Sequence, residues 1–160
     1  GKAKEPYDGS AIIFNGTQAE PVRTALGKQY GFGKGDGIEI DFLVEGGEGE
    51  STILSMADLE IRYVPAEGNV QVILYFDPQG EGPGYKILRH ALAPGNWAKL
   101  NVALLGNDFT VNMNGVTRKA LITNPLREKP SSLMLGARIV NNASARTLKG
   151  QIGKVRLSRN

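Results

Sequence analysis

Short runs of alternating apolar and polar residues, separated by glycine- and proline-rich turns, most constrain what this sequence can fold into. In GIEIDFLVE (37–45) and NVQVILYF (69–76) every second residue from Ile38 and from Val70 is apolar. This period matches the β-strand, in which successive side chains point to opposite faces. The runs are separated by turn-forming residues, as in PAEGN (65–69). Because no long segment keeps a helical period, the sequence predicts an all-β sandwich or barrel.

The apolar positions of these runs define a predicted core. Side chains two residues apart on a strand share one face, so each run has an apolar face and a polar face. The predicted core residues are Ile38, Ile40, Phe42, Val44, Leu59, Ile61, Tyr63, Val70, Val72, Leu74, Phe76, Leu100, Val102, Leu104, Phe109, Val111 and Met113. Two antiparallel sheets that pack through their apolar faces satisfy this pattern.

Length and composition limit the domain organisation and the classes of partner. A chain of 160 residues, 41% of them hydrophobic, is expected to form one domain with its own core. The absence of cysteine excludes disulfides, thiol nucleophiles and cysteine-ligated zinc. No apolar run approaches the ~18 residues of a membrane helix, so we expect no membrane insertion. The net charge of +3 is scattered along the chain, so we expect no nucleic-acid partner.

Several blocks of the chain, taken in order, resemble a known superfamily. PGNWAKLNVALLGNDFTVNMNGV (94–116) contains a tryptophan, an alternating strand and a hairpin that ends in Asn-Gly. SLMLGA (132–137) is followed by a polar loop and the glycine-bearing run LKGQIGKVRLSR (148–159), and SAIIFNG (10–16) opens the series. Together these blocks resemble the concanavalin A-like lectin/glucanase superfamily, and in particular its laminin-G-like (LamG-type) jelly-roll domains.

The resemblance implies a two-sheet antiparallel jelly-roll β-sandwich with a concave face and loops at its rim. We expect residues 10–160 to form a single domain of this kind, and residues 1–9 to be disordered or added during cloning. Members of the superfamily bind glycans, bind proteins, act as spacers beside catalytic domains or cleave polysaccharides.

The function favoured by this resemblance is a non-catalytic carbohydrate-recognition or accessory domain of an exported, extracellular or periplasmic protein. The expected partners are a glycan or polysaccharide and other domains of a larger polypeptide. The chain shows no export signal, which we expect to have been removed. A protein-interaction or spacer domain is an alternative function.

Three carboxylates in the run 37–45 offer a second alternative. Glycoside hydrolases use two carboxyl groups about 5–5.5 Å or about 6.5–9.5 Å apart, and residues two apart on a strand face are separated by about 6.5 Å. A polysaccharide-active enzyme could therefore use Glu39 and Asp41. The run also resembles the acidic signature of a glycoside hydrolase family with this fold, but Glu45 lies too far from Asp41 to match it. The competing interpretation is that these acids form the solvated side of an ordinary strand.

Polar residues on two neighbouring runs suggest a ligand site. If residues 57–64 and 69–76 form a hairpin, their polar side chains lie together, and Tyr75 can stack on a sugar beside hydrogen-bonding groups. Tyr85 follows a glycine- and proline-rich loop that could form a rim. The predicted ligand-binding residues are Glu60, Arg62, Gln71, Tyr75 and Tyr85. The enzyme alternative places Glu39 and Asp41 on this same face.

No cofactor or metal site is assigned from the sequence. Acidic loops such as EGGEGE (45–50) could supply oxygen ligands to calcium, but no calcium-loop spacing is present. The single histidine, His90, excludes a three-histidine metal site. Trp97 is expected to pack at the edge of the core.

Overall fold

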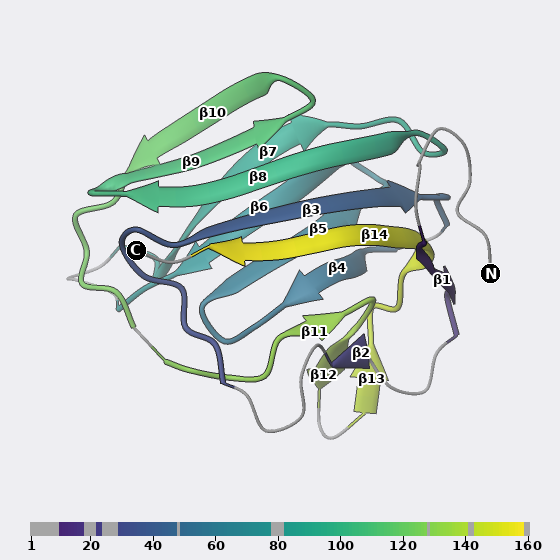
Figure 1. Ribbon diagram of the computed structural model, residues 1–160, viewed down its shortest axis with the longest axis horizontal. Coiled ribbons are helices and arrows are strands. Elements are labelled where there is room, and N and C mark those ends of the chain that lie inside the picture. Colours follow the sequence, from purple (N-terminus) through teal and green to yellow (C-terminus); the bar gives the residue numbers. More distant parts are fainter. Residues whose placement is uncertain are drawn as a thin grey trace.

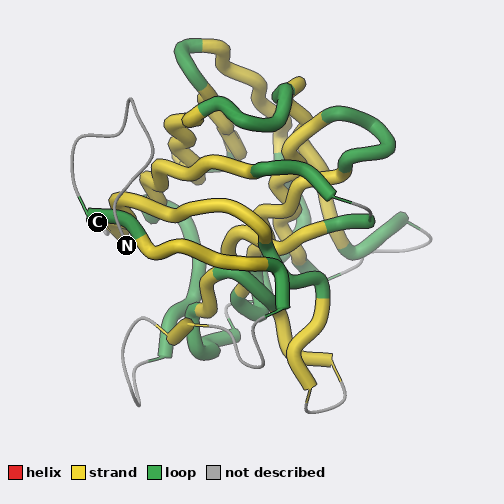
Figure 2. Tube along the Cα trace, turned by 90° about the vertical axis from the view of Figure 1, so that its right-hand side faces the viewer, coloured by secondary structure: helices red, strands yellow, loops and turns green. Residues whose placement is uncertain are grey.

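The computed structural model describes residues 10–17, 22–23, 29–47, 49–77, 82–127, 129–140 and 143–158. These residues form strands, turns and loops and contain no helix (Figure 2). The strands build two six-stranded antiparallel sheets and a two-stranded ribbon. Figure 1 shows the two large sheets stacked face to face. The predicted jelly-roll β-sandwich is therefore confirmed. Among the described residues, no helix is long and apolar enough to cross a membrane.

The first sheet, called the β3 sheet here, runs in the order β1-β14-β3-β8-β9-β10. Its strands are β1 (Ile12–Asn15), β14 (Lys149–Ser158), β3 (Gly37–Val44), β8 (Trp97–Leu105), β9 (Asp108–Met113) and β10 (Val116–Leu121). The Asn114-Gly115 dipeptide closes the β9–β10 hairpin with φ angles of 50° and 87°. Both residues adopt the left-handed backbone conformation, as the common two-residue hairpin turn requires.

The second sheet, called the β5 sheet here, runs in the order β2-β11-β4-β5-β6-β7. Its strands are β2 (Val22–Arg23), β11 (Met134–Leu135), β4 (Ser51–Ser55), β5 (Leu59–Val64), β6 (Asn69–Tyr75) and β7 (Tyr85–Ala91). The ribbon pairs β12 (Arg138–Val140) with β13 (Ala143–Ala145). Neither β2 nor the ribbon has the alternating pattern that marks the longer strands, so neither is predictable from the sequence.

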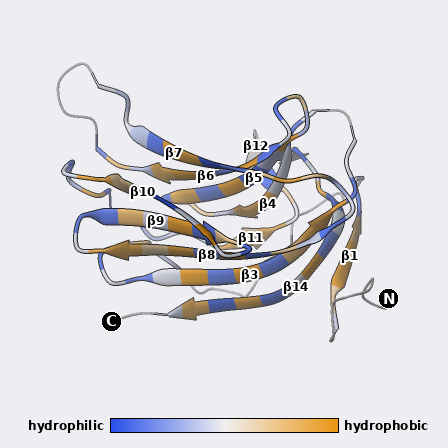
Figure 3. Ribbon diagram, turned by 90° about the horizontal axis from the view of Figure 1, so that it is seen from above, coloured by the Kyte–Doolittle hydropathy of each residue, from blue (hydrophilic) through white to orange (hydrophobic). Residues whose placement is uncertain are grey.

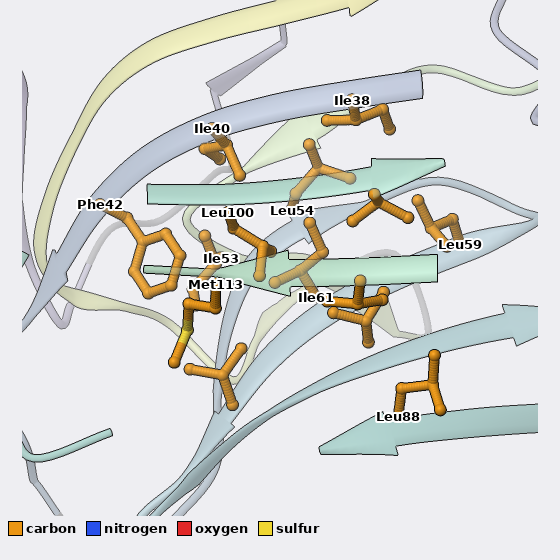
Figure 4. Packing of buried hydrophobic residues seen from close by; sticks show 14 of the residues in the cluster. Ile38, Ile40, Phe42, Ile53, Leu54, Leu59, Ile61, Leu88, Leu100 and Met113 are labelled. Atoms are coloured by element: carbon orange, nitrogen blue, oxygen red, sulfur yellow. The ribbon is translucent and has the colours of Figure 1, made fainter. Parts of the chain in front are cut away.

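Every predicted core residue is buried, so the core prediction is confirmed. Side chains from the two sheets meet between the layers, as Figure 4 shows for Phe42 and Leu100 of the β3 sheet and Ile61 of the β5 sheet. Burying an aliphatic or aromatic side chain of this size contributes about 1.5–3 kcal/mol to folding. His90 joins the layers as well, because its ring Nε2 lies 2.9 Å from the Val111 carbonyl oxygen of β9. Burial lowers the pKa of this imidazole, so the neutral ring is favoured in the folded protein.

The outward faces of the two sheets are covered to different extents. On the β3 sheet, the outward side chains of Lys99 and Asn101 are exposed, although those of Asp41, Leu43 and Gln151 are buried. On the β5 sheet, the outward side chains of Glu60, Gln71 and Ile73 are each only 2% exposed. Seen from above in Figure 3, the sheets form two layers, with β12 over the outer side of the β5 sheet. The outward face of the β5 sheet is therefore sheltered, and we call it the sheltered face.

Candidate functional site

The register of the β5 sheet brings the predicted polar residues together. Arg62 of β5 lies opposite Gln71 of β6, and Tyr75 lies opposite Tyr85 of β7. Glu60 lies two residues from Arg62, and hence on the same face. All five residues predicted from the sequence to bind a ligand thus lie on the sheltered face.

Arg62 and Gln71 form a partly buried hydrogen-bonded network, next to the Glu60 carboxylate. The Arg62 guanidinium donates to Gln71 Oε1 from Nη2 at 2.9 Å and from Nε at 3.2 Å. Gln71 in turn donates from Nε2 to Glu67 Oε2 at 2.8 Å and to Asn69 Oδ1 at 3.2 Å. These bonds fix the planes of the Arg62 and Gln71 side chains, so their polar groups are held in one orientation.

The Glu60 carboxylate is the most deeply buried charge in this network. Its Oε2 accepts a hydrogen bond from Arg138 Nη1 at 3.2 Å, and its Oε1 lies 3.7 Å from Arg62 Nη1. The second distance permits an ion pair but is too long for a hydrogen bond. A buried carboxylate is costly unless it is paired, so the two guanidinium groups explain why the charge is tolerated here.

A second carboxylate extends the network toward the rim. Glu50 Oε2 lies 3.5 Å from Arg62 Nη1 and 3.3 Å from Arg146 Nη1. Arginines and glutamates therefore alternate along the face in the order Arg146, Glu50, Arg62, Glu60 and Arg138. In this series Glu50, Arg62 and Glu60 each lie between two partners of opposite charge.

Two tyrosines lie at one end of the sheltered face. The rings of Tyr75 and Tyr85 pack edge to face, with centroids 6.5 Å apart and an interplanar angle of 61°. Tyr85 is 45% exposed, whereas Tyr75 is partly buried. Burial raises the pKa of the Tyr75 hydroxyl and the charge of Glu60 raises it further, so this hydroxyl is a neutral donor near pH 7. The exposed ring of Tyr85 presents an apolar surface beside fixed polar groups.

An open groove of about 580 Å³ runs between Tyr75, the segment that connects β10 to β11, and β12. It is lined by Ser55, Met56, Ala57, Glu60, Tyr75, Arg127, Ser131, Ser132, Met134 and Arg138. The lining combines hydroxyl groups, one carboxylate, two guanidinium groups and the apolar side chains of two methionines. Such a mixture of directional polar groups and apolar surface is typical of small-molecule binding sites.

The structure contradicts the prediction that Glu39 and Asp41 share the face of the other polar residues. Both belong to β3 and point outward from the β3 sheet, because their neighbours Ile38, Ile40 and Phe42 point into the core. Period-two alternation showed that the two acids face away from the core, but it could not show which sheet contains them. Glu39 instead lies 3.5 Å from Lys154 Nζ, on the opposite side of the sandwich from the groove.

Trp97 also lies differently from the expectation. It opens β8 opposite Leu43 and points outward from the β3 sheet, whereas Ala98 and Leu100 point into the core. The prediction that Trp97 packs at the core edge was wrong because this residue is out of phase with the inward positions of its strand.

The loop EGGEGE (45–50), which was considered as a source of calcium ligands, uses the carboxylate of Glu50 in ion pairs instead. Glu50 is paired with Arg62 and Arg146. Among the described residues, no group of three or more histidine, cysteine, aspartate or glutamate side chains is arranged to hold a metal ion. Glu48 lies outside the described residues. Calcium therefore stays unassigned, as in the prediction from the sequence.

Sequence reasoning missed the arginines that complete the site. Arg138 lies in β12, Arg146 follows β13, and Arg127 lies in the segment after β10. None belongs to an alternating strand, so no local pattern links them to Glu60 or Tyr75. Only the long-range chain path brings Arg127 and Arg138 to the groove and Arg146 to Glu50.

Comparisons with known proteins support the fold assignment. No family model matches the chain, and no curated protein matches it by sequence. Among solved structures, mouse laminin alpha1 domains LG4-5 match with a TM-score of 0.69 and 18% identity over 91% of this chain. The chain spans 40% of that laminin structure.

Two further structures show how widely this fold is used. The CBM40 of the Ruminococcus gnavus IT-sialidase, bound to α2,3-sialyllactose, matches with a TM-score of 0.69 and 12% identity. The match covers 94% of this chain and 90% of that one. Alginate lyase A1-II′ matches with a TM-score of 0.54 and 12% identity, over 82% of this chain and 65% of the lyase. These likenesses establish the concanavalin A-like fold, and the site must decide function.

Proposed function

We propose that this chain is a non-catalytic carbohydrate-recognition or accessory domain of an exported protein, which binds a glycan weakly on its sheltered face. The observation that most supports this proposal is the exposed ring of Tyr85 beside Tyr75, together with a groove and a fixed array of polar side chains. A sugar ring has apolar C–H faces and equatorial hydroxyl groups. Aromatic rings and planar polar side chains complement these two surfaces.

The arrangement of charges supports binding over hydrolysis. Hydrolysis by the common two-carboxylate mechanism needs a second acid about 5–9.5 Å from the first, on the same side of the substrate. Among the described residues that line the groove, Glu60 is the one carboxylate, and it is paired with Arg138. Glu39 and Asp41 face the opposite side of the sandwich.

The structural neighbours support the same proposal. The Ruminococcus gnavus CBM40 was solved with a bound sialyllactose, and it matches nearly the whole of both chains. It demonstrates that a domain of this fold and of similar length can bind an oligosaccharide. Binding of a glycan on the sheltered face would need no change in the fold of this chain.

We expect Tyr85→Ala to weaken glycan binding at least about 10-fold, because the exposed ring supplies the apolar platform. A glycan-array and polysaccharide-pulldown screen, with and without calcium, would identify the saccharide, and titration calorimetry would measure its affinity. Since Tyr85 is on an edge strand and 45% exposed, its truncation should leave the fold intact.

Leu121→Ala is the matched control, because Leu121 is 68% exposed on the opposite sheet. Its affinity should equal that of the unaltered chain. Failure of the whole screen would contradict the proposal, as would equal binding by the Tyr85→Ala variant.

A further inference from the structure

The groove contains a guanidinium group that the network described above does not use. Residues 125–127 run alongside the end of β6, where Phe76 bridges Leu126 and the Asp77 amide donates to the Pro125 carbonyl oxygen at 3.0 Å. In an antiparallel pair the residue after Leu126 lies opposite the residue before Phe76. Arg127 is therefore fixed beside Tyr75, and its guanidinium carbon lies 5.8 Å from the centre of that ring.

Arg127 has no acidic partner among the described residues. Glu60, the one carboxylate of the groove lining, is already paired with Arg138 at 3.2 Å and with Arg62 at 3.7 Å. The contact with Tyr75 lies near the ~6 Å limit of a cation–π interaction and offsets little of the charge. The groove therefore carries one unneutralised positive charge, from two arginines against one glutamate.

The other groups of the groove suit a sugar that bears a carboxylate. A guanidinium presents two parallel N–H donors that match a carboxylate, and such charge-assisted pairs are about twice as strong as neutral hydrogen bonds. The hydroxyl groups of Ser55 and Ser132 line the same groove and can serve the neighbouring sugar hydroxyls, whereas the Ser131 hydroxyl already accepts from the Ala57 amide at 2.7 Å. A neutral saccharide would leave Arg127 without a partner in a partly enclosed site.

We propose that the ligand is an acidic glycan, whose sugar carboxylate binds the Arg127 guanidinium beside Tyr75. This inference rests on the proposed function, since it names the class of glycan that the same site would take. It extends that function from carbohydrate recognition in general to selection of uronic acid or sialic acid units.

The test compares matched acidic and neutral saccharides by titration calorimetry. The probes are a galacturonate trisaccharide against its carboxyl-reduced form, and α2,3-sialyllactose against lactose. In at least one pair, the acidic member should bind about 10- to 100-fold more tightly, the range expected for a charged hydrogen-bonding pair. Arg127→Gln should remove that difference. Arg127→Lys keeps the positive charge but loses the two parallel N–H donors, so it should retain part of the difference.

Arg156→Gln is the charge-matched control. Arg156 is exposed on β14, opposite Glu39 on the far side of the sandwich. If attraction to the overall positive charge caused the selectivity, both arginine-to-glutamine variants would reduce it equally, and the inference would be overturned. It would also be overturned if the neutral member of each pair bound as tightly as the acidic one. In that case the proposed function would stand, whereas failure of every saccharide in the wider screen would reject both.

Discussion

Replacing Gly150 with alanine should lower the free energy of unfolding by about 3 kcal/mol, the upper end of the usual cost of overpacking. Gly150 lies in β14 opposite Val44 of β3. A Cβ atom added there would lie 2.0 Å from the Leu43 carbonyl oxygen and 3.0 Å from its carbon. Because the obstacle is backbone, no rotation of a side chain relieves it. β14 is held between β1 and β3, so the strand has no free direction in which to move.

The measurement is urea unfolding, with Gly31→Ala as the control. Among the described residues, the methyl group added at Gly31 would meet only Asp58 Oδ2, at an ordinary contact distance of 3.8 Å. This variant should stay within about 0.5 kcal/mol of the unaltered chain. Equal stability of the Gly150→Ala and Gly31→Ala variants would show that β14 and β3 lie farther apart than described here.

Removing the Glu60 carboxylate should also cost stability, by about 2 kcal/mol in Glu60→Ala. The substitution leaves Arg62 and Arg138 without the acid between them, and the loss of one partner from a fully buried pair costs about 3–5 kcal/mol. The side chains of Arg62 and Arg138 are 18% and 32% exposed, so water can solvate part of the released charge. Glu60→Gln should cost less, because the amide oxygen can still accept from Arg138.

Glu39→Ala provides the comparison for Glu60 in thermal or urea unfolding. The Glu39 side chain is 24% exposed and its partner Lys154 is 42% exposed, which is typical of a surface ion pair. Its removal should therefore change stability by less than about 0.5–1 kcal/mol. If the two alanine variants lost the same amount, Glu60 would behave as a surface residue and the sheltered face would be more open than described.

The core could be predicted from the sequence because the pattern that marks a core residue lies in its immediate sequence neighbours. Residues such as Ile40 and Val72 alternate with polar neighbours, and this alternation alone assigns a side chain to the inside. The Arg62–Gln71 contact was also within reach, since a short hairpin fixes which residues of two consecutive strands lie opposite each other. Alternation does not show which of the two sheets a strand joins. For that reason Glu39 was predicted to lie on the wrong side of the sandwich.

The remainder of the site depends on contacts between distant parts of the chain. Arg127 reaches Tyr75 through the Phe76–Leu126 bridge, and Arg138 reaches Glu60 from a ribbon that covers the face. Both arginines lie outside the long alternating strands. Their sequence neighbourhood resembles any polar loop, so only the three-dimensional path shows that they converge.

The most direct test of glycan binding on the sheltered face is a nuclear magnetic resonance titration of the isotope-labelled chain with a saccharide that it binds. We predict that the amide signals which shift belong to β5, β6 and β7 and to the residues around Arg127 and Arg138. Shifts confined to β3, β8 and β14, around Glu39 and Asp41, would place the ligand on the opposite side of the sandwich and contradict the proposed site.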